Sequence, residues 1–264
     1  MGIKTYVFFD IETTGLPYQE KNHTKITELT FVAVSRNDLE NGDNQALPPT
    51  NKLSLLFNPQ RHISEKVCNL TGLSNNYLKN QAIFKDKIKI INSFLELPKP
   101  VCLIAHNGNR FDYKILLSEY LDAQETLPSD LLCVDSLSGF RHVMKNIDIE
   151  QCKNKKICTS YDYNVEDTSD WPELDISNED WDKIDSLVAS FSEMASPKTD
   201  NKKMSYSLSN LYKVLLGKEP VNAHRAETDC VMLLECVLAV KEDFLSWADA
   251  KCKPIKEIKP LTRM

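Results

Sequence analysis

The chain has 264 residues, of which 42% are hydrophobic, 27% charged and 8% aromatic. This composition suits one globular domain and excludes a fibrous or wholly disordered protein, and no apolar run reaches the roughly 18 residues that span a bilayer. The net charge of −6 argues against a nucleic-acid partner, because polyanions bind basic surfaces, but only if that charge is evenly spread.

Three short strands separated by polar loops are predicted at the start of the chain. Their sequences are TYVFFDI at 5–11, ITELTFVAVS at 26–35 and KLSLLFNP at 52–59. Helical and strand patterns then alternate: short helical pieces around 64–74, a helix at 83–97, a strand at 101–106, a helix at 112–123 and a strand at 131–135. This order predicts an α/β fold with a mixed sheet of roughly five strands flanked by helices.

Residues 141–204 interrupt the pattern with weak periodicity and many Asp, Asn, Lys and Ser residues. We expect a partly irregular insertion within a single domain that spans 1–264. From Asp162 to Glu193 it has eleven acidic residues and one lysine, a net −10, whereas the rest of the chain carries 27 acidic and 31 basic residues, or +4. The body is therefore mildly basic, and the overall charge no longer argues against nucleic acid.

Regular structure resumes with a helix at 205–217 that ends at Gly217, followed by a last helix that starts between Ala226 and Asp229 and continues to 250. Glycine-rich phosphate loops, a G-x-S-x-G elbow and H-E-x-x-H are all absent. Carboxylates and histidines remain as candidates for chemistry.

The first candidate is the D-x-E pair Asp10 and Glu12, which follows four apolar residues of the first strand. Residues two apart on a strand share a face, so both carboxylates can hold one Mg²⁺ or Mn²⁺ ion. The spacing alone is weak, because it recurs at 38–40 and 148–150 in polar surroundings. The alternative is a pair of solvated carboxylates at a strand end.

The second candidate is Asp112, in the first turn of the helix that follows the apolar strand and the polar loop HNGNR. Its ordinary explanation is a favourable interaction with the helix N-terminus. Loops at the carboxyl ends of strands are also where α/β folds bind ligands.

The third candidate is His224, five residues before Asp229. The two side chains converge if His224 lies on the loop that enters the last helix and Asp229 lies in its first turns. A neutral imidazole there could accept a proton from water near pH 7. The alternative is a surface histidine at a helix start.

The order of these candidates resembles the DEDDh class of 3′-to-5′ exonucleases, which have a ribonuclease H-like fold. Over most of the chain apart from 141–200, it resembles the three-prime repair exonuclease (TREX) family. The segments that carry this resemblance are FFDIETTGLP, KLSLLFNP, NLTGLS, LIAHNGNRFDYKILLSEY, SYSLSNLYKVLLGKEPVNAHRAETD and FLSWADAKCKPIKEIKPL.

The resemblance implies that Asp10, Glu12, Asp112 and Asp229 hold two divalent ions, Mg²⁺ with Mn²⁺ as an alternative, and that His224 deprotonates the attacking water. The implied reaction is stepwise 3′-to-5′ hydrolysis that releases 5′-mononucleotides by in-line displacement.

Substrate contacts follow from the same resemblance. The apolar residues Leu16, Pro17 and Leu70 would pack on the terminal nucleotide. Its 3′ hydroxyl would be held by backbone groups of the segment Thr13, Thr14, Gly15 and Leu16.

Arg110 would face a phosphate or support the metal site, and Lys202 and Lys203 match a basic loop that contacts nucleic acid. Composition alone favours a solvated loop for that lysine pair. Phe111 replaces a tyrosine that is usual in the family's HNGxRYD motif, a change that we expect to be tolerated.

We therefore expect a metal-dependent exodeoxyribonuclease that acts on single-stranded DNA or frayed duplex 3′ ends. The alternatives are an exoribonuclease of the same fold and a non-catalytic nucleic-acid-binding module. The family implies a homodimer formed through strand edges, with KLSLLFN as the apolar edge. No C-x-x-C pair occurs among the eight cysteines, so we expect reduced thiols and an intracellular protein of the cytoplasm or nucleus. We also expect no membrane attachment, because no apolar run is long enough to span a bilayer.

Overall fold

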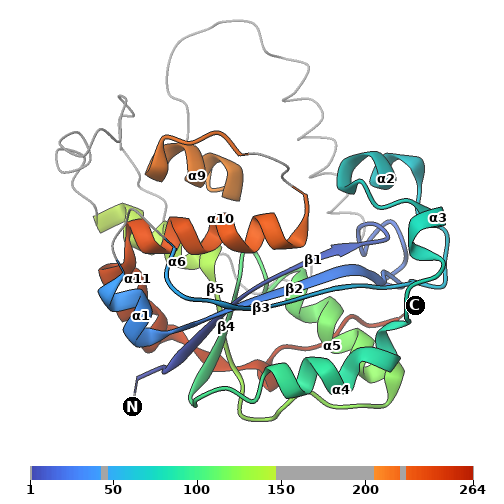
Figure 1. Cartoon of the computed structure of the whole chain (residues 1–264), viewed down its shortest axis with the longest axis horizontal. Helices are drawn as coiled ribbons and strands as arrows, with labels where there is room; N and C mark the ends of the chain where they lie inside the picture. The colour runs from blue at the N-terminus through green and yellow to red at the C-terminus, as the bar shows by residue number, and fades with distance from the viewer. Residues whose placement is uncertain (1, 43–46, 147–204, 221–223, 264) are drawn as a thin grey trace, which may run out of the picture. The chain divides into compact units, whose positions relative to one another are not determined.

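The computed structural model describes residues 2–42, 47–146, 205–220 and 224–263, which together form one compact unit. Its centre is a six-stranded sheet with the strand order β3-β2-β1-β4-β5-β6 (Figure 1). The strands are β1 (Thr5–Thr13), β2 (Ile26–Ser35), β3 (Asn51–Leu56), β4 (Val101–Ala105), β5 (Leu132–Asp135) and β6 (Lys253–Pro254).

The sheet is mixed, as predicted. Strands β1, β2 and β3 form an antiparallel meander, whereas β4 and β5 run parallel to β1. The prediction of roughly five strands missed β6, a two-residue strand that pairs antiparallel with β5. A strand this short that contains a proline has no periodicity to detect.

Helices cover both faces of the sheet (Figure 1). On one face α10 crosses β1 and β2 and carries α9 on its outer side, while α4 and α5 cover the opposite face. The described helices are α1 (Arg36–Asn41), α2 (Glu65–Thr71), α3 (Asn75–Leu78), α4 (Phe84–Phe94), α5 (Asp112–Ala123), α6 (Ser136–Asn146), α9 (Leu208–Leu216), α10 (Ala226–Ala239), α11 (Lys241–Lys251) and the short 3₁₀ helix η1 (Ile255–Glu257).

Strand β1 explains how the sheet presents both a core and a polar site. Val7, Phe9 and Ile11 belong to one buried cluster with residues of α4 and α5. Side chains alternate along a strand, so Asp10 and Glu12 point to the other face, toward α10. One strand therefore anchors the core and carries two carboxylates.

Two helix predictions differ from the structure. The predicted continuous helix to 250 is wrong, because the chain breaks at Val240 (φ −130°, ψ 28°) and restarts as α11, whose Phe244 packs on Phe140 of α6. This break has no glycine or proline to signal it. The insertion was predicted to begin at 141, but helix α6 continues to Asn146. The rest of that segment, 147–204, lies outside the described residues.

Candidate active site

The predicted carboxylates meet where β1, β4 and β5 end. Asp10 and Glu12 lie near the end of β1, Asp112 is the first residue of α5, and Asp229 lies in the first turn of α10. Parallel strands that end at one edge bring their following loops and helices together, which is why residues far apart in sequence converge here.

The electrostatics show how close these groups lie. Burial raises the pKa of Asp10 well above its usual range, and the charges of Asp112 and Asp229 raise it further. Burial, with the charges of Asp229 and Glu28, raises the pKa of Glu12 to about 8. Burial also raises the pKa of Asp112 to about 8; its side chain is only 3% exposed. Several carboxylates held together in this way favour either protons or cations.

His224 lies on the loop before α10, as the spacing of His224 and Asp229 predicted. Its backbone N–H donates to Oδ2 of Asp229 at 3.2 Å. Ligand atoms of Glu12, His224 and Asp229 all lie within 4.8 Å of one another. The structure therefore places an exposed histidine just before α10, as the alternative had it, but one whose ring lies close to the carboxylates of Glu12 and Asp229.

The donor set fits a divalent cation. Oδ1 of Asp229 is buried and has no hydrogen-bond partner among the described residues. A buried carboxylate oxygen without a partner is costly unless a cation or proton occupies that position. Hard oxygen ligands are those that Mg²⁺ and Mn²⁺ prefer.

Asp135, at the end of β5, was not predicted and organises the loop before α5. Its carboxylate accepts backbone N–H groups of Asn107, Asn109 and Leu137, each at 3.0 Å. Burial raises the pKa of Asp135, and the three backbone bonds and the charge of Arg110 oppose that rise. Asp135 therefore fixes the turn from which Asp112 enters the site.

Glu28 was also missed. This buried residue of β2 lies directly opposite Glu12 and accepts hydrogen bonds from Nε and Nη2 of Arg225 at 2.9 and 2.8 Å. A sequence signal existed, because a glutamate inside the apolar run ITELTFV needs a partner if the strand is buried.

The segment predicted to hold a terminal nucleotide follows β1. Oγ1 of Thr13 donates to the carbonyl of Gly15 at 2.9 Å, and Oγ1 of Thr14 donates to Glu20 at 2.7 Å. Leu16 is 42% exposed and Leu70 is 53% exposed, so both side chains are accessible to a ligand. Leu70 also lines a cavity of about 830 Å³.

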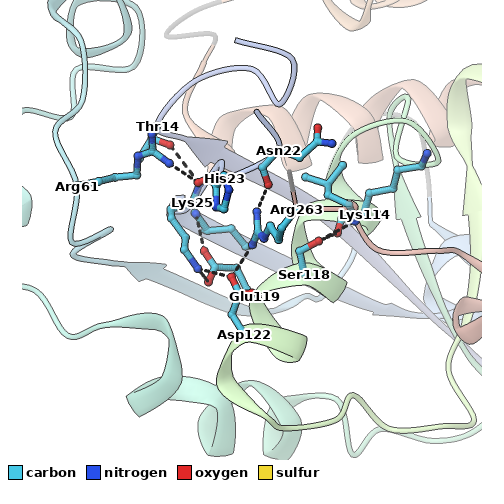
Figure 2. Close-up of polar contacts among 12 residues, drawn as sticks. Thr14, Asn22, His23, Lys25, Arg61, Lys114, Ser118, Glu119, Asp122 and Arg263 are labelled. Atoms are coloured by element: carbon cyan, nitrogen blue, oxygen red, sulfur yellow. Dashed lines mark hydrogen bonds and ion pairs between the residues drawn. The ribbon is translucent and has the colours of Figure 1, made fainter. Parts of the chain in front are cut away.

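Four charged residues, Lys25, Glu119, Asp122 and Arg263, form a clamp that holds the continuation of this loop, residues 17–25 (Figure 2). Arg263 donates to the carbonyl of Asn22 and to the carboxylate of Asp122, while Nδ2 of Asn22 donates to the carbonyl of Thr262 at 2.8 Å. Lys25 donates to Asp122 at 2.6 Å and to Glu119 of α5 at 3.0 Å. The loop is thus tied to α5 and to the segment around 262.

Other predicted residues are not part of this cluster. Arg110 is exposed, and Lys202 and Lys203 lie outside the described residues. The second D-x-E copy, at 38–40, lies in α1, where Asp38 bonds Ser35 and Glu40 pairs with Arg36; the third, at 148–150, is outside the described residues. Within the described ranges, no helix is long and apolar enough to cross a membrane.

Comparison with known proteins agrees with this geometry. The exonuclease family model RNase_T matches residues 7–162. Three-prime repair exonuclease 1 of Bos taurus is 29% identical over 273 residues, covering 98% of this chain and 70% of the relative. Three prime repair exonuclease 2 of Mus musculus is 28% identical over 268 residues, covering 98% and 92%.

A solved structure of E. coli exonuclease I with a dT13 oligonucleotide matches 92% of this chain with a TM-score of 0.57 at 15% identity. That match spans 43% of exonuclease I, so the chain corresponds to less than half of it. The likeness confirms the predicted ribonuclease H-like fold. The family model, which matches more than half of the chain, shows that this chain belongs to the RNase_T exonuclease family.

Proposed function

We propose that this protein is a metal-dependent 3′-to-5′ exodeoxyribonuclease that degrades single-stranded DNA or frayed duplex 3′ ends to 5′-mononucleotides. The observation that carries the proposal is the convergence of Asp10, Glu12, Asp112 and Asp229 with His224 at one edge of the sheet. Membership of an exonuclease family and similarity to three-prime repair exonucleases support it.

The four carboxylates would hold two Mg²⁺ ions, with Mn²⁺ as a substitute. Bound divalent ions would supply Lewis-acid stabilisation of the charge on the attacking and leaving oxygens. His224, exposed at the rim of the cluster, would accept the proton of the attacking water. Asp229 accepts the backbone N–H of His224 and so orients the loop that presents the imidazole.

Substrate would enter beside the loop after β1. Backbone groups of Thr13, Thr14, Gly15 and Leu16 would hold the 3′ hydroxyl. Leu16, Pro17 and Leu70 would pack against the terminal base, an interaction that tolerates any base because every base has an apolar face.

Basic residues would bind the rest of the strand. We propose this role for Arg110, whose charge already acts on Asp135, and for Lys202 and Lys203. Contacts to phosphate of this kind give affinity without sequence preference.

The test is digestion of a 5′-labelled single-stranded DNA with Mg²⁺, alongside RNA of the same sequence. We expect stepwise shortening of DNA, mononucleotide products, and loss of activity in EDTA. Asp10→Ala should lower the rate by several orders of magnitude, whereas Asp38→Ala, which alters the D-x-E copy in α1, should not. Faster RNA digestion would favour the exoribonuclease, and DNA binding without product would favour a non-catalytic module.

We further propose a homodimer through β3. Among the described residues this strand pairs with β2 on one side and with no strand on the other, and its Leu53 and Leu55 are partly buried against the core. Light scattering of the purified protein tests this assembly.

We propose a single exonuclease domain spanning 1–264. We also propose a site of action in the cytoplasm or nucleus, because the described cysteines are free thiols.

A further inference from the structure

An ion pair between the buried Glu28 and Arg225, whose side chain is 44% exposed, joins the sheet to the start of α10. The side chain of Glu28 is 3% exposed and lies opposite Glu12 in the β1–β2 pair. Its two oxygens accept Nε and Nη2 of Arg225 at 2.9 and 2.8 Å, and Oε2 also accepts the backbone N–H of Ala226 at 3.1 Å. This two-point geometry fixes the guanidinium plane as well as its distance, which a lysine could not do.

The same pair determines where α10 begins. Arg225 is the N-cap residue of this helix, and its side chain makes no capping bond. Glu28 instead supplies an acceptor for the N–H of Ala226, the first helical residue, and places negative charge at the positive end of the helix.

His224 is held between two anchored points. On one side its own N–H bonds to Asp229 at 3.2 Å, and on the other the next two residues bond to Glu28. Its φ is +69°, in the left-handed region that is unfavourable for a residue with a side chain. Surrounding contacts must maintain that conformation, and the two hydrogen bonds that the next residue, Arg225, makes with Glu28 are among them.

Arg225 also offsets a charge. Without it, Glu28 would be an unpaired fifth carboxylate beside the four proposed metal ligands. Because the guanidinium of Arg225 neutralises Glu28, the net charge of the site is that of the four proposed ligands alone.

We propose that Arg225, locked by Glu28, is a positioning residue that fixes the backbone of His224 and so aims its imidazole at the attacking water. This inference rests on the proposed function of His224 as the general base. Arg225 acts through its neighbour and touches neither the reacting atoms nor the metal ligands in this role.

A double-mutant cycle on single-stranded DNA digestion tests the proposal, with Arg225→Ala, His224→Ala and the double variant. Arg225→Ala should lower kcat about 100-fold, the loss expected from a misplaced catalytic group, with KM changed less than about threefold. In the His224→Ala background the same substitution should lower kcat by less than about threefold, because the residue through which it acts is gone.

Two further variants control for folding. Glu28→Gln removes the charge and the second oxygen that hold Arg225 at two points but keeps an acceptor for the N–H of Ala226, and it should reproduce the loss without leaving a buried charge unpaired. Glu227→Gln is the matched control: Glu227 pairs with Lys52 of β3 at 3.1 Å, so it also links the sheet to the first turn of α10, but both partners are exposed. Its kcat should stay unchanged.

A second readout does not depend on turnover. In protein with isotope-labelled histidine, the ring resonance of His224 is assigned by its absence in His224→Ala. Arg225→Ala and Glu28→Gln should shift it, and Glu227→Gln should not.

The inference is overturned if that resonance stays in place in Arg225→Ala, or if Arg225→Ala lowers kcat equally with and without His224. A rise in KM alone would instead make Arg225 a DNA contact, since it also lines the cavity beside Leu70. If the parent protein releases no nucleotide, yet the His224 resonance shifts in Arg225→Ala and Glu28→Gln, the proposed function fails while the positioning of His224 stands.

Discussion

Replacing Asp112 by asparagine should stabilise the metal-free protein. Asp112 is 3% exposed, and burial raises the pKa of its carboxyl from 3.8 to about 8. At pH 7 the unfolded chain carries this group ionised, so folding must protonate it or bury its charge. At about 1.4 kcal/mol per pH unit between 3.8 and 7, this costs at most about 4 kcal/mol, and after structural relaxation we expect roughly 2 kcal/mol.

The sign follows from proton binding. Because the folded state binds more protons than the unfolded state between the two pKa values, stability falls as pH rises from about 4 to about 8. Asp112→Asn removes this dependence and should raise Tm in EDTA at pH 7 by about 4–8 °C, given about 2–4 °C per kcal/mol for a chain of this size. Asp10 and Glu12 also have raised pKa values, so in both proteins they contribute a further fall of stability with rising pH.

Thermal melts in EDTA from pH 5 to 8 measure both quantities. Asp122→Asn, on the same helix, is the matched control: burial raises its pKa, but hydrogen bonds from Lys25 and Arg263 outweigh burial and lower it, so this substitution should reduce Tm at pH 7. Mg²⁺ should raise the Tm of the parent and leave Asp112→Asn nearly unchanged. The reasoning is refuted if Asp112→Asn melts at or below the parent in EDTA at pH 7.

Three further outcomes follow from the site and its surroundings. Because burial raises the pKa of Glu12 to about 8, Mg²⁺ binding should release protons and tighten from pH 6 to 8, as calorimetry in buffers of different ionisation enthalpy would show; a pH-independent affinity would contradict this. Leu70→Ala should raise KM for single-stranded DNA about tenfold with Tm unchanged, since the side chain is 53% exposed; an unchanged KM would remove Leu70 from the substrate site. Arg263→Ala removes the donor to the carbonyl of Asn22 and one of the two cations that pair with Asp122, so backbone hydrogen exchange should speed up in residues 17–25. Equal exchange in both proteins would show that the clamp does not stabilise this loop.

Local pattern indicated the carboxylates, but each signal was weak by itself, and their order along the chain, which resembles that of the DEDDh exonucleases, singled them out. Asp10 and Glu12 stand two residues apart on a strand whose other face is apolar, and Asp112 begins a helix after a buried strand, so their directions follow from the periods of strand and helix. The position of His224 before α10 followed from the same geometry. The mixed sheet was predictable because its strands, apart from β6, are long enough to show an apolar run or an alternating pattern.

Contacts between distant segments could not be predicted in this way. Nothing near Glu28 in sequence names Arg225 as its partner, and the three backbone bonds to Asp135 depend on the fold of another loop. The break at Val240 likewise follows from packing of α11 on α6, since no local residue demands it. Tertiary packing decided these features, and a single sequence does not contain the pairing.

The contacts that complete the site also set the order of its assembly. Asn22 bonds to Thr262 across 240 residues, and Glu28 bonds to Arg225 across 197. During synthesis β1, β2 and β3 emerge first and can pair, but Arg225 and Thr262, which complete these contacts, leave the ribosome long after the three strands. Contacts of such long sequence separation also form slowly. A growing chain therefore contains the carboxylates of β1 before it contains His224, and the proposed nuclease activity begins only once the later segments have packed against the sheet.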